Sequence, residues 1–302
     1  MSLPPRRSLA GEPAEELPPS ARGLSLRALV PNAITAAALC SGLTGIRFAI
    51  AGDWERAVFA VILAGLLDGI DGRAARALKA QSKFGAELDS LADSISFGVA
   101  PALIVYLWSL QNLPSIGWFA ALAFAICCVL RLARFNARID LPDQPHKQAG
   151  FLTGVPAPVG AGLAFLPLYL WIATGWTALT NPLGVAIWML AIAFLLISSL
   201  PTLSWSRLRP RRTIRIEIIA AVGLVVAALL TEPWYTLVGI TLVYLALLPL
   251  GVYLYWKLKQ RRETADSPKL EPLDTEALGL PRDGGERSSR EAAPPNDQDR
   301  LV

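Results

Sequence analysis

Charged residues are scarce in this sequence. Of its 302 residues, 17% are Asp, Glu, Lys or Arg and 53% are hydrophobic, whereas a soluble domain has about 25% charged residues. Histidine occurs once, and the three cysteines lie in apolar stretches without the spacing of a zinc site or a disulfide framework. The net charge of +4 does not indicate a nucleic acid partner, because the basic residues gather at the ends of apolar stretches. The composition indicates a membrane protein whose partner is the lipid bilayer.

The N-terminal residues lack the pattern of a cleavable signal. Residues 1–27 are polar and contain no short apolar run followed by a small-residue cleavage site. We therefore expect residues 1–27 to be a cytoplasmic segment and the first spanning helix to direct insertion.

Apolar stretches of about 20 residues fill the middle of the chain, each long enough to cross the hydrocarbon core as a helix. They cover residues 29–50, 56–79, 89–110, 116–138, 152–174, 181–201, 214–231 and 234–256. This pattern predicts an all-α integral membrane protein, a polytopic bundle of about eight transmembrane helices in a domain over residues 28–257. Residues 258–302 are too polar to bury a core, so we expect a disordered cytoplasmic tail.

Basic residues follow alternate spans, and this asymmetry predicts the orientation. The second, fourth and sixth spans are followed by Arg73, Arg76, Lys79 and Lys83, by Arg131, Arg134, Arg138 and Lys147, and by Arg207, Arg209, Arg211 and Arg212. The other connections carry almost no basic charge. Because cytoplasmic loops are enriched in Lys and Arg, both termini are expected in the cytoplasm.

Four aspartates lie in or beside two otherwise apolar spans: Asp68, Asp71, Asp89 and Asp93. An ionised carboxylate at membrane depth costs at least about 2.5 kcal/mol, so such residues normally face a cavity, a partner charge or a metal. Their spacings of three and four place each pair on one helical face. If the two faces meet, they form an all-oxygen site for Mg²⁺ or Mn²⁺, and a two-metal site suits a diphosphate substrate. The alternative for any single Asp is an interfacial residue in contact with water.

Residues between the acids fit the same chemistry. Gly72 and Gly85 remove side chains where a nucleotide can approach the backbone, and Arg76 can pair with a phosphate. Close helix packing explains either glycine equally well.

The run 68–76, Asp-Gly-Ile-Asp-Gly-Arg-Ala-Ala-Arg, followed by Gly85, Asp89 and Asp93, resembles the signature of the CDP-alcohol phosphatidyltransferases. The resemblance implies a core of six transmembrane helices, to which two C-terminal spans are added. It also implies that Asp68, Asp71 and Asp89 bind the metals, and that Asp93 completes the second metal site and acts as general base.

The resemblance extends to the CDP-diacylglycerol contacts. It implies that Gly72, Arg76, Ser82 and Gly85 contact this substrate, and Asn32 and Thr35 are further candidates because residues 31–35 resemble the start of the family's first span. Without the resemblance, Pro31 reads as the first residue of a helix and Thr35 as a packing residue.

The acceptor alcohol is indicated by other segments. Residues 89–101, 130–136 and 154–158 resemble the bacterial and archaeal phosphatidylserine synthase subgroup, which implies transfer to L-serine, a cell-membrane location and a homodimer. Arg131, Arg134 and Asn136 are the candidate acceptor-binding residues, because the carboxylate of serine needs cationic or amide donors. Positive-inside anchoring explains both arginines equally well.

Three other functions compete with transfer to serine. In the first, the same transfer is made to another alcohol, such as inositol phosphate, glycerol 3-phosphate or choline. In the second, the acids form the ion pathway of a cation or proton transporter. In the third, the chain is a structural membrane anchor. A transporter predicts acids spread along several spans and inverted repeats, whereas the acids here cluster beside one basic loop and no repeat is evident.

Overall fold

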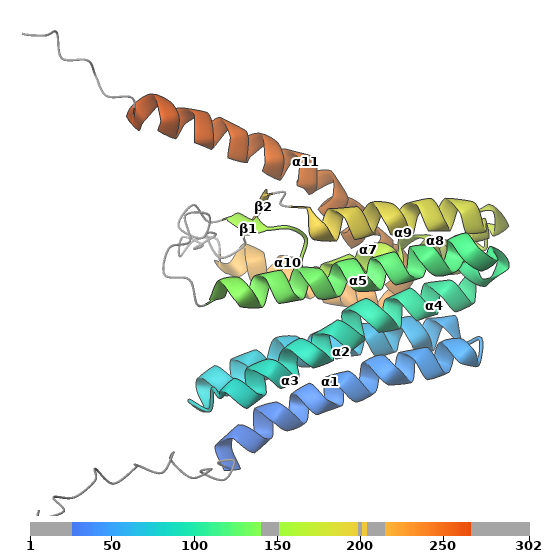
Figure 1. Ribbon diagram of the computed structural model, residues 1–302, viewed down its shortest axis with the longest axis horizontal. Coiled ribbons are helices and arrows are strands. Elements are labelled where there is room, and N and C mark those ends of the chain that lie inside the picture. Colours follow the sequence, from blue (N-terminus) through green and yellow to red (C-terminus); the bar gives the residue numbers. More distant parts are fainter. Residues whose placement is uncertain (1–25, 140–150, 199–200, 204–214, 267–302) are drawn as a thin grey trace, which may run out of the picture. The chain divides into compact units, whose positions relative to one another are not determined.

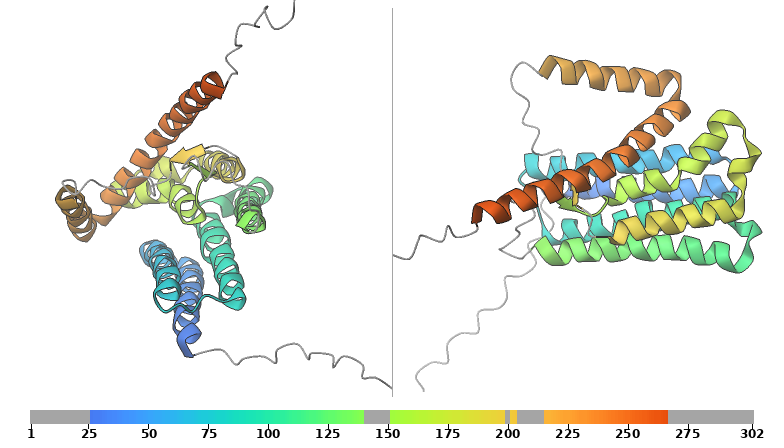
Figure 2. Two further views of the ribbon diagram at one scale, coloured as in Figure 1. Left: turned by 90° about the vertical axis from the view of Figure 1, so that its left-hand side faces the viewer. Right: turned by 90° about the horizontal axis from the view of Figure 1, so that it is seen from above.

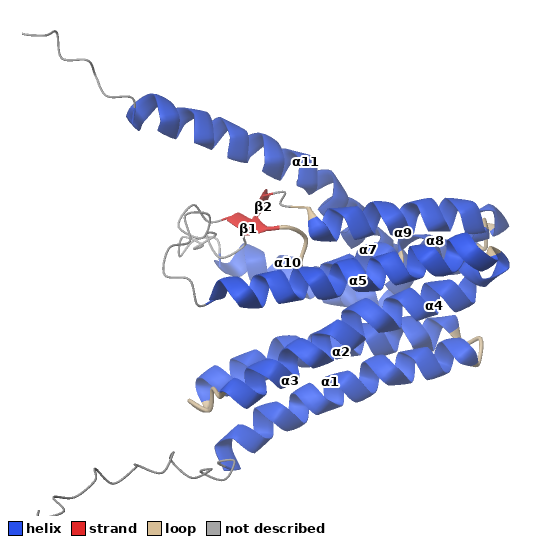
Figure 3. Ribbon diagram, viewed as in Figure 1, coloured by secondary structure: helices blue, strands red, loops and turns tan. Residues whose placement is uncertain are grey.

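The computed structural model describes residues 26–139, 151–198, 201–203 and 215–266, and these are almost entirely helical (Figure 3). The longer helices are α1 (Leu26–Ile50), α2 (Trp54–Ala77), α3 (Lys83–Asp93), α4 (Ala100–Trp108), α5 (Pro114–Ile139), α7 (Ala157–Ala164), α8 (Leu166–Thr174), α9 (Pro182–Ile197), α10 (Arg215–Thr231) and α11 (Pro233–Asp266). Short segments are the π-helix η1 (Ser94–Val99) and the 3-10 helices η2 (Leu110–Asn112) and η3 (Thr177–Thr180). The predicted all-α membrane fold is confirmed.

Each predicted span falls for most of its length on helical segments of the described chain. Length and composition, however, identify fewer than eight helices that could cross a membrane. Within the described residues, four helices are long and apolar enough to cross a membrane: Arg27–Ile50, Lys83–Trp108, Pro114–Ala137 and Pro233–Gly251. The pair α7 and α8 makes a fifth if it counts as one bent span. α2 has the length of a span, with 24 residues, but carries Asp68 and Asp71. The count of eight transmembrane helices stays a prediction.

The helices α1 to α9 pack side by side around a core of small, branched and aromatic apolar residues (Figures 1 and 2). α1 and α2 form an antiparallel hairpin, in which a Cβ added to Gly45 would lie 3.0 Å from the carbonyl oxygen of Ala57. Small residues allow such close backbone approach between membrane helices. α1 also packs against α3, η1 and α4, while α5 packs against η1 and α9. The acidic segments of α2 and α3 therefore lie within a packed set of helices.

A proline explains the break between α7 and α8, which are bent by 41°. Pro167 has no N–H to offer the carbonyl of Leu163, four residues earlier. The indole Nε1 of Trp188, on α9, donates to that carbonyl at 2.9 Å. The bend thus keeps its freed backbone acceptor paired, as a helix in lipid requires.

Two boundaries differ from those predicted. α1 begins at Leu26, so Pro31 lies inside it and is not its first residue. Residues 151–153 and 201–203, predicted to lie at or near the ends of two spans, form an antiparallel pair of strands, β1 (Phe151–Thr153) and β2 (Pro201–Leu203), with Leu152 opposite Thr202 (Figure 3). Gly154, at φ +78°, and Pro156 prevent a helix from starting earlier than Ala157.

The C-terminal helix α11 continues to Asp266, nine residues beyond the predicted end of the membrane domain. The remainder of the predicted tail, 267–302, and the N-terminal residues 1–25 lie outside the described residues. The predicted division into segment, membrane domain and tail stays a prediction.

Candidate active site

A tight turn brings the acidic ends of α2 and α3 together. α2 ends at Ala77, and Lys79 adopts a left-handed φ of 50°, the conformation that commonly ends helices. Ser82 then caps α3, its Oγ accepting a hydrogen bond from the N–H of Gly85 at 3.0 Å. The chain reverses within five residues, so the faces of Asp68 and Asp71 on α2 and Asp89 on α3 meet.

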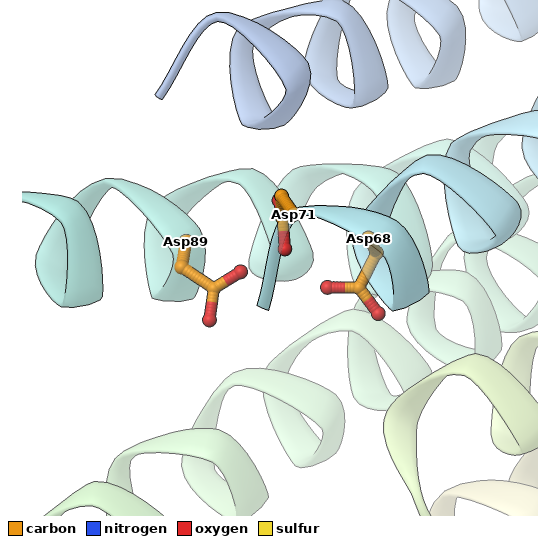
Figure 4. Close-up of side chains that lie close together, drawn as sticks. All are labelled: Asp68, Asp71 and Asp89. Carbon is orange, nitrogen blue, oxygen red and sulfur yellow. The ribbon is translucent and has the colours of Figure 1, made fainter. Parts of the chain in front are cut away.

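Three carboxylates converge at this point, as Figure 4 shows. One oxygen from each of Asp68, Asp71 and Asp89 lies within 4.8 Å of the others. Asp93, one turn after Asp89, lies beside Asp68 and lines the same narrow crevice. The structure therefore brings together the four acids that the spacing singled out.

The four acids lie close together without a salt-bridge partner among the described side chains. Asp71 is only 4% exposed and Asp68, Asp89 and Asp93 are partly buried, yet within the described ranges none of the four forms a salt bridge. Like charges at this separation in a low-dielectric site repel strongly. A donor set of carboxylate oxygens alone fits a hard divalent cation such as Mg²⁺ or Mn²⁺.

Thr35 fixes one of the acids. Its hydroxyl donates to Oδ2 of Asp71 at 2.6 Å and lies 3.1 Å from the carbonyl oxygen of Pro31. Thr35 is 5% exposed. Sequence reasoning proposed Thr35 as a nucleotide contact and missed this hydrogen bond, because no spacing rule relates a residue on α1 to one on α2.

A cleft of about 270 Å³ opens beside the acids. Its lining contains both Asp71 and Asp89. It also contains every residue proposed to contact CDP-diacylglycerol: Asn32, Thr35, Gly72, Arg76, Ser82 and Gly85. Residues chosen from three separate sequence segments thus share one cleft that adjoins the carboxylates.

Gly85 has the closer neighbours of the two glycines that line the cleft, and its substitution gives a testable prediction. A Cβ at this position would lie 3.0 Å from Oδ1 of Asn32 and 3.1 Å from Oγ of Ser82. We expect Gly85→Ala to raise the KM of the nucleotide substrate by about tenfold, because the methyl group displaces two lining side chains. Gly69→Ala is the matched control, since a Cβ there meets nothing within 4 Å. Steady-state kinetics that show the same KM for both variants would refute the assignment of this cleft.

The three proposed acceptor residues on α5 have different surroundings. Asn136 donates through Nδ2 to Oγ of Ser90 at 2.7 Å, and Arg134 donates through Nη2 to the carbonyl of Ser198 at 3.4 Å. Arg131 interacts electrostatically with Asp93, and its Nε is buried without a hydrogen-bond partner among the described residues. Arg131 is therefore the one of the three that presents a buried, unpaired donor near the acids.

Sequence reasoning missed two features near the site. The π-helical segment η1 begins directly after Asp93, at the kind of position where π-helices mark functional sites. Tyr244, on α11, is close enough to Arg131 for the guanidinium charge to act on its hydroxyl, which is buried without a hydrogen-bond partner among the described residues. A hydroxyl in an apolar span was the available signal for Tyr244, but several other tyrosines carry the same signal.

Comparisons with known proteins agree with the geometry. A family model described as CDP-alcohol phosphatidyltransferase matches residues 28–199, and one described as CDP-alcohol phosphatidyltransferase 2 matches residues 213–249. The CDP-diacylglycerol--serine O-phosphatidyltransferase of Mycobacterium leprae is 38% identical over 238 residues, 78% of each chain. The enzyme of that name from Mycobacterium tuberculosis is 36% identical over 255 residues, 83% of this chain and 88% of its own. The one from Bacillus subtilis is 34% identical over 171 residues, 57% of this chain and 88% of its own.

Proposed function

This chain belongs to the CDP-alcohol phosphatidyltransferase family, and we propose that it transfers the phosphatidyl group of CDP-diacylglycerol to L-serine, giving phosphatidylserine and CMP. The observation that carries the proposal is the convergence of three carboxylates beside one cleft lined by all the proposed nucleotide contacts. Serine as the acceptor is supported by the names of relatives that cover most of this chain. The protein is a transferase of phospholipid biosynthesis.

The aspartate cluster is the proposed metal centre. The family uses divalent metal, and carboxylate oxygens of Asp68, Asp71 and Asp89 are close enough to share an ion. We assign Asp93 to the second metal position because it lines the same crevice. Mg²⁺ or Mn²⁺ would act as a Lewis acid on the phosphoryl oxygens and orient the diphosphate.

Residues of the protein carry out the proton transfer and hold the substrates. The serine hydroxyl oxygen attacks the β-phosphorus, which bears the diacylglycerol, as Asp93 accepts the hydroxyl proton. A new P–O bond to serine forms, the bond from the β-phosphorus to the bridging oxygen breaks, and CMP leaves with that oxygen. Gly72, Gly85 and Arg76 line the cleft that holds the nucleotide and its phosphates, while Asn32, Thr35 and Ser82 complete its wall.

The acceptor is assigned to α5, on the side where Arg131 interacts with Asp93. Arg134 and Asn136, which bond to Ser198 and Ser90, position the neighbouring elements and border this acceptor site. An arginine suits a carboxylate because its planar fork donates two parallel hydrogen bonds.

The proposal also covers the location of the protein in the cell, its orientation in the membrane and its oligomeric state. The apolar helices make the protein a multi-pass membrane protein. We place it in the inner membrane with both termini in the cytoplasm, where the cleft faces water-soluble serine, and as a homodimer. The basic residues that follow the last apolar stretch of the sequence, such as Lys257 and Arg261, suit contact with anionic lipid headgroups.

Metal dependence tests the proposed function directly. Purified protein in mixed micelles with CDP-diacylglycerol should release CMP on addition of serine, lose this activity with EDTA, and regain it with Mg²⁺ or Mn²⁺. Inositol phosphate, glycerol 3-phosphate and choline serve as competing acceptors. If only one of these alcohols supports CMP release, that alcohol and not serine is the acceptor. Serine-dependent release that persists fully in EDTA would refute the metal centre.

The transporter alternative makes the opposite prediction in the same preparation. Protein that binds divalent cations but releases no CMP with any acceptor, and that carries cations across proteoliposome membranes, would overturn the transferase assignment. Clustering of the acids in one crevice, rather than along several helices, favours transfer.

A further inference from the structure

We propose that Tyr244, on α11, forms with Arg131 the subsite that binds the carboxylate of the acceptor and so determines the preference for serine over uncharged alcohols. The inference rests on the proposed function and adds to it a residue outside the matched segment 28–199.

Two buried polar atoms identify the subsite. Among the described residues, the buried side-chain nitrogen and oxygen atoms without a hydrogen-bond partner are Nε of Arg131 and the hydroxyl oxygen of Tyr244. A buried donor left unpaired costs about 1–3 kcal/mol, and more if it is charged, so native structures contain few. The Arg131 guanidinium is close enough for its charge to act on the Tyr244 hydroxyl, so both unpaired donors lie in one region. Two donors in one region suit the two oxygens of one carboxylate.

The packing of α5 places this region at the level of the proposed base. A Cβ added to Gly98, in η1, would lie 3.4 Å from Cβ of Cys128, and Asn136 is hydrogen-bonded to Ser90 at 2.7 Å. Both contacts fit one antiparallel register between α5 and the continuous segment formed by α3 and η1. In that register Arg131 lies within two residues of the level of Asp93, a rise of about 3 Å along the helix axis. The interaction of Arg131 with Asp93 agrees with this placement.

The size of serine requires such proximity. The hydroxyl of serine is on Cβ and its carboxylate is attached to the adjacent Cα. A group that binds the carboxylate must therefore lie near the base that receives the hydroxyl proton. Arg131 meets this requirement, whereas Arg134 and Asn136 already bond to other parts of the chain. The Tyr244 hydroxyl supplies an additional donor that completes the carboxylate site.

The location of Tyr244 explains how one reaction centre can serve a particular acceptor. The acids and the nucleotide cleft lie on α1 to α3, and their chemistry does not depend on which alcohol attacks. Tyr244 comes from the segment matched separately, residues 213–249, and its helix packs on the common core through Leu237, Leu245 and Leu248. A site built to hydrogen-bond one substrate group discriminates against analogues that lack it.

Removing a single hydroxyl oxygen tests the proposal. The full-length Tyr244→Phe protein, assayed with CDP-diacylglycerol, should show a KM for serine raised by about tenfold, since one hydrogen bond to a charged group is lost. The KM for CDP-diacylglycerol should stay within about twofold. Selectivity for serine over serinol, which replaces the carboxylate with a hydroxymethyl group, should fall by about the same tenfold. Arg131→Lys, which keeps the charge and loses the planar fork, should shift the same two quantities.

Tyr235→Phe is the matched control. Tyr235 lies on the same helix, is 57% exposed, and donates to the carbonyl of Ala173 at 2.9 Å; its loss should leave serine selectivity unchanged. An unchanged serine KM in Tyr244→Phe would overturn the subsite, and so would equal losses with serine, serinol and CDP-diacylglycerol, which indicate a packing role. Failure of the proposed function is distinguishable, because the unaltered protein would then show no serine-dependent CMP release.

Discussion

Asp93→Asn is expected to lower kcat for serine-dependent CMP release by about 10²–10⁴-fold, the range lost when a general base is removed. The amide preserves the size and shape of the side chain but can neither accept the hydroxyl proton nor carry a charge to a metal. CDP-diacylglycerol should still bind, because the nucleotide cleft is lined by Asp71 and Asp89 and not by Asp93. Steady-state kinetics with CMP detection, together with equilibrium binding of the nucleotide substrate, separate the two effects.

Glu87→Gln is the control for this substitution. Glu87 is on the same helix, α3, is exposed, and lines neither the cleft nor the crevice. Glu87→Gln replaces a carboxylate with an amide, as Asp93→Asn does. The kcat of the Glu87→Gln protein should stay within about twofold of that of the unaltered protein, as expected for a surface change remote from a site. Asp93→Asn protein with more than a tenth of the original kcat would exclude Asp93 as the base.

The clustering of the acids was predictable because its signal is local. Spacings of three and four residues specify a shared helical face without knowledge of the fold, and charge in an apolar span demands a function. Asp68, Asp71, Asp89 and Asp93 line one crevice as expected. Asp68 and Asp71, together with charged neighbours such as Arg73, keep α2 out of the helices that length and composition identify as spans, because charge contradicts the apolar preference of a membrane helix.

Contacts between distant segments were not predictable. The hydrogen bond from Thr35 to Asp71 and the approach of Tyr244 to Arg131 depend on how helices are rotated and shifted against each other. Apolar residues cover most faces of a membrane helix, so the pattern that fixes rotation in a soluble helix is weak here. Hydropathy also failed to reveal β1 and β2, because residues 151–153 and 201–203 continue apolar stretches.

Asp71→Asn is expected to reduce maximal activity by about 10³-fold or more and to raise the Mg²⁺ or Mn²⁺ concentration needed for half-maximal activity. Asp71 is the most buried of the cluster, 4% exposed, and one of the three acids whose oxygens lie within 4.8 Å of each other. Replacing it with a neutral amide removes charge that holds a cation stabilising the phosphoryl oxygens, an effect of several kcal/mol. Activity measured across a metal titration gives both quantities at once.

The surroundings of Asp71 make this loss specific to charge. An asparagine oxygen can still accept the hydrogen bond that Thr35 donates to Oδ2 at 2.6 Å, so the packing of α1 on α2 should persist. Asp53→Asn provides the control, because Asp53 also lies at the α1–α2 hairpin but caps α2 and pairs with Arg56 at 3.2 Å. That variant should lose some stability, about 1 kcal/mol or less, with its metal requirement unchanged. Equal metal requirements in the Asp71 and Asp53 variants would mean that the cluster does not bind the catalytic ion.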